Sequence, residues 1–195
     1  MIKIIENCLS DSILDRTKTL IEDPSVPWHF LPGSTSETSA SDYLNYSFQH
    51  TPYMSGKVMS NYFEISNTIG LILKDKFELR GYYIDRLRWG LVTSIGKLFK
   101  NSPHIDTKVP HKTILFYPHD SDGETYFYND KHEVTESVMP KMNRAVLFDG
   151  SVLHSSSKPI QTARRIVLNV NLIHVLLSYY IICQVIYQTF HYSFY

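Results

Sequence analysis

Two histidines and one aspartate are the residues of this sequence best suited to chemistry. His104 and Asp106 lie two positions apart, and His154 follows a later predicted strand. In extended backbone, side chains two positions apart point to the same face, so His104 and Asp106 converge. Two imidazoles and one carboxylate on one side of a metal form the facial set that holds ferrous iron and leaves positions for other ligands. We therefore predict that these three residues are metal ligands and catalytic residues.

An arginine further along the chain could anchor an anion beside that metal. Arg165 opens a predicted strand whose alternation places Arg165, Val167 and Asn169 on one face, while Arg164 faces the other way. A guanidinium grips a dicarboxylate bidentately, with better planar matching than lysine. Tyr117 could add a phenolic hydrogen bond. The alternatives are a solvated Arg165 with Arg164 as the anchor, and a Tyr117 that is only a core residue.

Short β-type segments dominate from Leu79 onward. Gly, Pro, Asn and Asp separate them, as is typical of turns between strands. Such a series predicts an antiparallel sandwich or barrel. The predicted strands are Leu79–Val92, Lys112–Tyr117, Thr125–Tyr128, Arg144–Phe148 and Arg165–Leu172.

The part of the chain before these strands is predicted to be mainly helical. Ser10 is suited to cap a helix over Asp11–Glu22, and the spacing of apolar residues predicts a longer helix between Lys57 and Phe77. The longer helix would cover one face of the sheet. Gly33–Ser41 is small and polar without periodicity, which indicates a surface loop and a candidate lid or substrate loop.

The composition indicates one globular domain. The chain has 195 residues, of which 43% are hydrophobic, enough to bury a core. Nineteen basic and nineteen acidic residues cancel, so neither nucleic acid nor a membrane is an expected partner. Cys8 and Cys183 form no disulfide framework and no zinc motif, which suits a reducing compartment. The N-terminus lacks the pattern of a secretory signal, so we expect a cytoplasmic protein.

The segment from about Leu79 to Asn171 resembles the 2-oxoglutarate- and Fe(II)-dependent dioxygenases, specifically the prolyl 4-hydroxylase-like group. About half of the chain carries the resemblance, and the matching segments together are more specific than the two histidines and the aspartate alone. They are Asp85–Arg88, Pro103–Asp106, Pro110–Tyr117, Asp120–Thr125, Pro140–Gly150, His154 and Arg165–Asn169.

The resemblance implies a fold, a site and a reaction. The implied fold is α+β, with a double-stranded β-helix (a jelly-roll, cupin-like core) braced by N-terminal helices. Iron would be held by His104, Asp106 and His154, and 2-oxoglutarate would chelate it with its far carboxylate on Arg165 and Tyr117. Dioxygen would be the other co-substrate and ascorbate a further cofactor. A C–H bond of a small-molecule or peptidyl substrate, such as a prolyl group or an amino acid, would be hydroxylated with release of succinate and CO2.

The same resemblance bears on neighbouring residues. Related halogenases lack the carboxylate that Asp106 supplies, so its presence favours hydroxylation over halogenation. His111 matches the family pattern and either orients a metal ligand or caps a strand. Arg86 and Arg88 could touch substrate, but a solvated strand face is the commoner explanation, and we leave them out of the predicted site.

Simpler explanations exist for the metal ligands. His104 and Asp106 could be a hydrogen-bonded surface pair, and His154 an ordinary histidine at the end of a strand. Two other protein classes also retain these residues: a cupin-like protein that binds zinc or another metal, and a catalytically silent binding domain. Neither class turns over 2-oxoglutarate.

The organisation of the chain follows from these predictions. We expect a single domain in which 1–78 supplies helical support and substrate loops and 79–173 forms the catalytic core. Residues 174–195 are a hydrophobic tail that members of the group usually lack. A membrane helix, which needs about 20 mainly apolar residues, is one alternative for this tail, and the polar residues that interrupt it make that alternative the less favoured one. An additional core or oligomer-forming helix, or an accidental extension of the reading frame, would also explain it.

Overall fold

A helical layer and two facing β-sheets make up the structure, a computed structural model that describes residues 1–33 and 44–176. The helices are α1 (Asp11–Ile21) and α2 (Phe63–Lys76). The strands are β1 (Lys3–Ile5), β2 (His29–Leu31), β3 (Ser47–Met54), β4 (Lys57–Val58), β5 (Tyr82–Thr93), β6 (Phe99–Lys100), β7 (Lys112–Tyr117), β8 (Thr125–Tyr128), β9 (Val134–Val138), β10 (Arg144–Asp149), β11 (His154–Lys158) and β12 (Arg164–His174).

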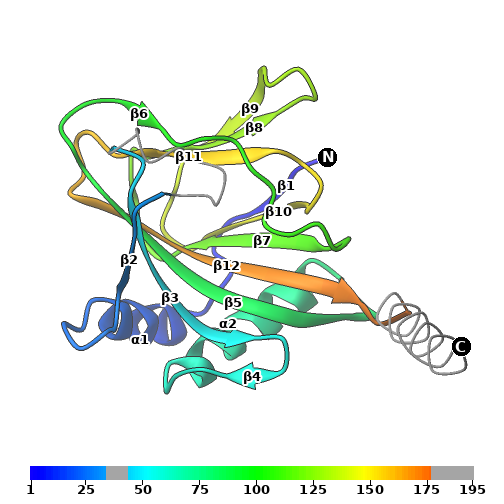
Figure 1. The fold of residues 1–195 in the computed structure, drawn as a ribbon. Helices are drawn as coiled ribbons and strands as arrows, with labels where there is room; N and C mark the ends of the chain where they lie inside the picture. The colour runs from blue at the N-terminus through cyan, green and yellow to red at the C-terminus, as the bar shows by residue number, and fades with distance from the viewer. Residues whose placement is uncertain (34–43, 177–195) are drawn as a thin grey trace, which may run out of the picture.

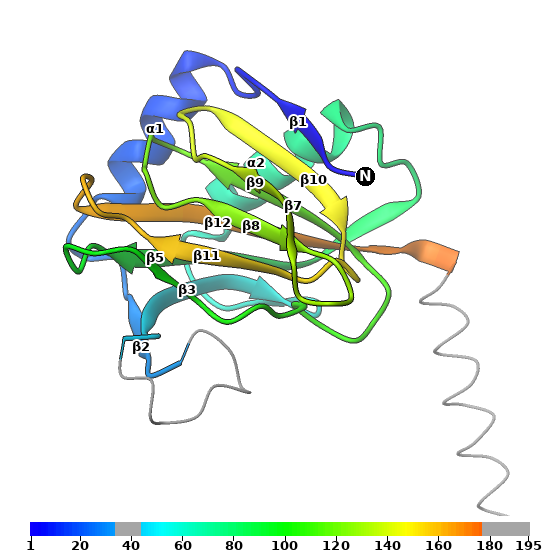
Figure 2. The same ribbon diagram turned by 90° about the horizontal axis from the view of Figure 1, so that it is seen from above.

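The strands pair antiparallel in both sheets. The larger sheet has the order β1-β10-β7-β12-β5-β3-β2, with β4 paired to β3 at its edge, and the smaller sheet has the order β6-β11-β8-β9. Both helices lie on the outer face of the larger sheet, and the smaller sheet covers the other face (Figures 1 and 2). This is the predicted α+β arrangement of a double-stranded β-helix braced by helices.

Alternation along β12 separates two buried regions. Ile166, Leu168 and Val170 point to the helical side, where they join a core with residues of α1 and α2. Val167 points between the sheets and joins a smaller cluster. Its alternate neighbours Arg165 and Asn169 lie on the same inner face, because strand side chains alternate. The space between the sheets therefore combines apolar packing with buried polar groups.

Gly70 explains how α2 can pack tightly on the sheet despite a glycine in its interior. A Cβ at this position would lie 2.8 Å from Cδ1 of Ile84 and 3.3 Å from Cδ2 of Leu87. Close helix–strand packing therefore offsets the low helix propensity of glycine.

The predicted helix between Lys57 and Phe77 is wrong over its first turns, because α2 begins at Phe63. Lys57 belongs instead to a hairpin in which β3 and β4 are joined by Ser55 and Gly56. Both of these residues have positive φ, 48° and 81°. Two such residues form the tight turn that matches the twist of a hairpin, and Ser-Gly is a recognisable signal for it.

The predicted strands β7 and β8 have the expected bounds, whereas β5 begins three residues later than predicted, at Tyr82. β12 begins at Arg164 and continues to His174. The sequence patterns did not predict β1, β2, β3, β4, β6, β9 and β11. The described part of 1–78 thus contains four strands besides the two helices.

Two predictions concern segments outside the described residues. The candidate lid loop Gly33–Ser41 lies outside them except for Gly33, and so does the tail beyond Leu176. Among the residues that the structure describes, no helix is long and apolar enough to cross a membrane.

Candidate metal centre

His104 and His154 are brought together by a short backbone bridge. Their N–H groups donate to each other's carbonyl oxygens, both over 3.0 Å. His154 begins β11 of the smaller sheet, and the two imidazole rings lie 4.7 Å apart between centroids. With Asp106, they form a group whose candidate ligand atoms all lie within 4.8 Å of one another. The structure thus brings together the three residues predicted as metal ligands.

Backbone carbonyls set the orientation of both imidazoles. Nδ1 of His104 bonds to the carbonyl of Ser102 over 3.2 Å, and Nδ1 of His154 bonds to the carbonyl of Val152 over 3.1 Å. A carbonyl only accepts hydrogen bonds, so Nδ1 carries the proton in each ring. In the neutral ring, Nε2 then has a free lone pair, which is the form that binds a metal.

The protonation states also suit a metal. Burial, and next the neighbouring His154, lowers the pKa of His104 to about 4. Burial likewise lowers the pKa of His154. Burial alone would raise the pKa of Asp106, but Arg88, His154 and Arg86 hold it well below its usual range. At neutral pH the group therefore consists of two neutral imidazoles and one carboxylate.

Four side chains hold the carboxylate of Asp106, which is fully buried. Nη2 of Arg86 and of Arg88 lie 2.9 Å and 3.1 Å from Oδ1. Asn169 and Asn171 donate to Oδ2 over 2.9 Å and 3.0 Å. An ionised carboxylate has about four acceptor sites, so a metal ion bound here would replace one of these donors.

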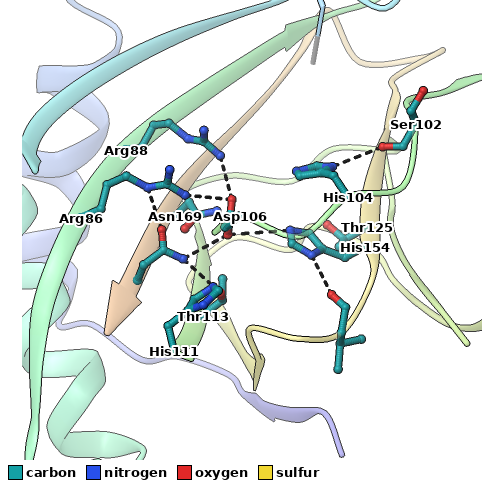
Figure 3. A network of polar contacts seen from close by, with 12 residues as sticks. Arg86, Arg88, Ser102, His104, Asp106, His111, Thr113, Thr125, His154 and Asn169 are labelled. Carbon is teal, nitrogen blue, oxygen red and sulfur yellow. Dashed lines mark hydrogen bonds and ion pairs between the residues drawn. The ribbon is translucent and has the colours of Figure 1, made fainter. Parts of the chain in front are cut away.

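The two arginines correct a sequence-based prediction. We expected Arg86 and Arg88 on a solvated strand face, but both point from β5 toward Asp106, opposite the two histidines (Figure 3). Leu87 and Trp89, which alternate with them, are buried on the helical side. This alternation was the available signal, because it assigns both arginines to the inner face of the sheet.

Arg165 lies at a second polar position between the sheets. It is 3% exposed, and its Nη2 donates to Oγ1 of Thr125 over 2.7 Å. The hydroxyl of Tyr117 shares a hydrogen bond of 2.7 Å with the same Thr125 oxygen, and the tyrosine ring lies 5.5 Å from the guanidinium carbon. Burial lowers the pKa of Arg165. No carboxylate of the described residues pairs with it, and its Nε has no hydrogen-bond partner there.

Arg164 has the opposite environment. It forms an ion pair of 2.7 Å with Glu22, and both side chains are about half exposed. Of the two candidate anchors, Arg165 is therefore the one inside the fold.

A cavity of about 100 Å³ connects the two polar positions. His104 and His154 line it, as do Arg165 and Thr125, so the candidate metal ligands and the buried arginine share one space. Its other lining residues come mainly from β3, β5, β11 and β12. A small ligand in this cavity could contact a metal and the guanidinium together.

His111 does not contact the ligand atoms directly. Its Nδ1 donates to the carbonyl of Val109 over 2.7 Å, and its own carbonyl accepts from the backbone of Gly150 over 2.8 Å. Within the described part of the chain, its Nε2 has no partner. These bonds fit the predicted role of capping a strand, here at the start of β7. Among the described residues, no hydrogen bond supports the other predicted role, which was to orient a metal ligand.

Solved structures resemble this fold, whereas no family model and no curated protein sequence matches the chain. One similar structure is a 2OG-Fe(II) oxygenase family oxidoreductase from Burkholderia pseudomallei, with 12% identity and a TM-score of 0.67. That alignment covers 88% of this chain and 84% of the other. Another is a Trichoplax adhaerens prolyl hydroxylase in complex with a hypoxia inducible factor peptide fragment, with 15% identity, a TM-score of 0.64 and coverage of 90% and 84%.

A third similar structure is SnoN, a non-heme alpha ketoglutarate dependent epimerase from nogalamycin biosynthesis. It has 10% identity and a TM-score of 0.59, with coverage of 89% of this chain and 77% of the other. These likenesses confirm the predicted double-stranded β-helix and place the chain among folds of the 2OG-Fe(II) oxygenases. At such low identity they establish the fold alone, so the reaction has to be argued from the site.

Proposed function

We propose that this protein is a non-haem Fe(II)- and 2-oxoglutarate-dependent dioxygenase that hydroxylates a C–H bond and releases succinate and CO2. One observation carries the proposal. A cavity between the sheets is lined at one position by two candidate metal ligands and at another by Arg165, which has no carboxylate partner among the described residues. A metal site and a carboxylate anchor in one space are what a chelating keto acid needs.

His104, Asp106 and His154 would hold the iron. Their two imidazoles and one carboxylate match the ligand preference of ferrous iron in oxygenases. When bound, iron supplies a template for the keto acid and the redox chemistry of dioxygen activation. Ascorbate is proposed as a reductant that keeps the iron ferrous.

Arg165 would bind the far carboxylate of 2-oxoglutarate. Its unpartnered Nε and its Nη2, now bonded to Thr125, give it donors for a charge-assisted bond. Tyr117 would orient the guanidinium of Arg165 through the hydroxyl of Thr125, to which both Tyr117 and Arg165 are hydrogen-bonded. Because the site is buried, such a bond is stronger than it would be in water.

The surroundings would keep the ligand set in one arrangement during turnover. Backbone carbonyls fix both imidazoles, and the side chains around Asp106 fix its carboxylate. Burial excludes water from the reacting groups, which limits unproductive oxidation. Asp106 leaves no position for a halide in its place, so hydroxylation is the proposed outcome.

The proposed substrate is a prolyl group or another peptidyl or amino-acid substrate. One structural neighbour is a prolyl hydroxylase in complex with a peptide fragment, whereas another is an epimerase. The fold thus accommodates different reactions, and the proposal of hydroxylation depends on the site residues of this chain.

Binding under anaerobic conditions tests the site before any substrate is known. We expect about one Fe(II) per chain and 2-oxoglutarate binding that requires the metal. Asp106→Ala should abolish both, since it removes the only charged ligand of the set. Zinc binding without metal-dependent 2-oxoglutarate binding would instead identify a different metal protein, and binding of neither ligand would identify a silent domain.

A further inference from the structure

The cavity has more positive charge around it than the proposed co-substrate can balance. Arg86 and Arg88 both contact the single carboxylate of Asp106. Arg165 adds a third guanidinium, and no aspartate or glutamate occurs among the described residues that line the cavity. If 2-oxoglutarate, a dianion, offsets the two charges of Fe(II), then three guanidiniums still face one carboxylate.

The two arginines at Asp106 differ in what else they contact. Nε of Arg86 donates to Oδ1 of Asn171 over 2.7 Å, and its Nη2 lies 2.9 Å from Oδ1 of Asp106 in an ion pair that has no hydrogen-bond geometry. Among the described residues, the side chain of Arg88 has one hydrogen bond, of 3.1 Å, from Nη2 to Asp106. Its side chain is 26% exposed, against 17% for Arg86, and of the two only Arg88 lines the cavity.

Asp106 carries one negative charge, so it balances only one of the two guanidiniums that contact it. A guanidinium has five N–H donors, of which Arg88 uses one on Asp106. Arg88 lines the same cavity as His104 and His154, where the primary substrate would have to lie.

We propose that Arg88 binds a carboxylate of the primary substrate, so that the substrate class is carboxylate-bearing. This inference depends on the proposed function and narrows its substrate. The carboxylate comes either from a free amino acid or from an acidic side chain or C-terminus of a peptide. A guanidinium binds such a group through parallel N–H bonds that fix its orientation, which would position the neighbouring C–H bond at the metal.

Matched pairs of compounds test the proposal. Succinate formation by the Fe(II)- and 2-oxoglutarate-loaded protein is measured with the common L-amino acids and with their amides. It is also measured with end-blocked peptides that contain either glutamate or glutamine beside proline. We expect stimulation by carboxylate-bearing members, with KM about tenfold or more lower than for the matched amides. The amino-acid and peptide arms identify the source of the carboxylate.

Variants assign the effect to Arg88. Arg88→Gln should raise KM for the acid about 30-fold or more and remove the difference between acid and amide, whereas Arg88→Lys should retain part of it. Arg86→Gln is the matched control: it contacts the same Asp106 oxygen but does not line the cavity. It should change metal affinity and kcat while leaving the acid-to-amide ratio of KM unchanged.

Two sets of results would overturn the assignment. One is equal stimulation by acids and amides, or stimulation by no carboxylate-bearing compound. The other is an acid preference that survives in Arg88→Gln. Failure of the proposed function has a different signature, since the wild-type protein would then show no metal-dependent binding of 2-oxoglutarate in the absence of any of these compounds.

Discussion

Arg165 on β12 and Thr125 on β8 are joined by a hydrogen bond of 2.7 Å that connects the larger sheet with the smaller one. The bond occupies Nη2 of the guanidinium and leaves Nε without a partner among the described residues. A buried cation with incomplete hydrogen bonding is costly unless an anion completes it. The relationship between these two residues therefore supports a carboxylate ligand at this position.

Removing the guanidinium should separate co-substrate binding from metal binding. In Arg165→Ala we expect the affinity for 2-oxoglutarate to fall by about 2–4 kcal/mol, or roughly 30- to 900-fold, because a buried charge pair loses one partner. Calorimetric titration of the Mn(II)-loaded protein with 2-oxoglutarate measures this change. The affinity for Mn(II) itself should stay near the wild-type value.

Arg164→Ala is the control for that experiment. Arg164 is the adjacent residue, but it pairs with Glu22 at the surface, and exposed pairs contribute little. We expect wild-type 2-oxoglutarate affinity in this variant. If Arg164→Ala lost the co-substrate while Arg165→Ala kept it, the anchor would have been assigned to the wrong arginine.

A second prediction concerns the packing beside the metal ligands. A Cβ at Gly150 would overlap the ring of His111, which is buried and bonded to the carbonyl of Val109. Gly150→Ala should therefore destabilise the protein by about 1–3 kcal/mol and lower Tm by roughly 2–12 °C in a thermal melt. Gly90→Ala is the comparison, since within the described part of the chain its Cβ would meet only Cγ1 of Val167, at an ordinary 3.5 Å. Equal Tm values for the two variants would contradict the predicted overlap.

The pH dependence of stability should reveal Lys158. This side chain is fully buried, and its Nζ donates to the carbonyl of Tyr46 over 2.9 Å. Burial lowers its pKa from 10.5 to about 8. Between these values the unfolded chain holds a proton that the folded chain has released, so stability rises with pH. Burial of the charged Lys158 lowers the free energy of unfolding by its full amount below pH 8, and this destabilisation disappears as the pH rises toward 10.5.

Urea unfolding at pH 7 and pH 9.5 measures this effect. The Lys158 contribution should increase the free energy of unfolding by roughly 2 kcal/mol between these two pH values. Lys158→Met keeps the length of the side chain without the titrating group, so it should lack this increment. If the free energies of unfolding of the wild type and of Lys158→Met changed in parallel with pH, Lys158 would titrate normally.

The sequence was sufficient for the residues whose signals are local. The strands β7 and β8 are short apolar runs between turn residues, and their bounds were predicted correctly. Alternation also placed Arg165 and Asn169 on one face of β12, where the structure has them. The His104 and Asp106 pair was found because its spacing fits extended backbone.

Other features depend on contacts that no local pattern contains. β3 includes Pro52, which argues against a strand, and it forms because β5 and β2 lie on either side of it. The grouping of Arg86, Asn171 and Asp106 joins three separate segments of the chain. A charged strand residue such as Arg86 usually faces solvent, so its buried partner could be identified only after the sheet was assembled.

Succinate formation tests the central claim most directly. Anaerobically purified protein is supplied with Fe(II) and 2-oxoglutarate, dioxygen is admitted, and succinate is measured for the wild type and for Asp106→Ala. Our account predicts succinate from the wild type, in at least a slow reaction without primary substrate, and none above background from the variant. Succinate at equal rates from both proteins, or a wild type that neither binds nor consumes 2-oxoglutarate, would contradict it.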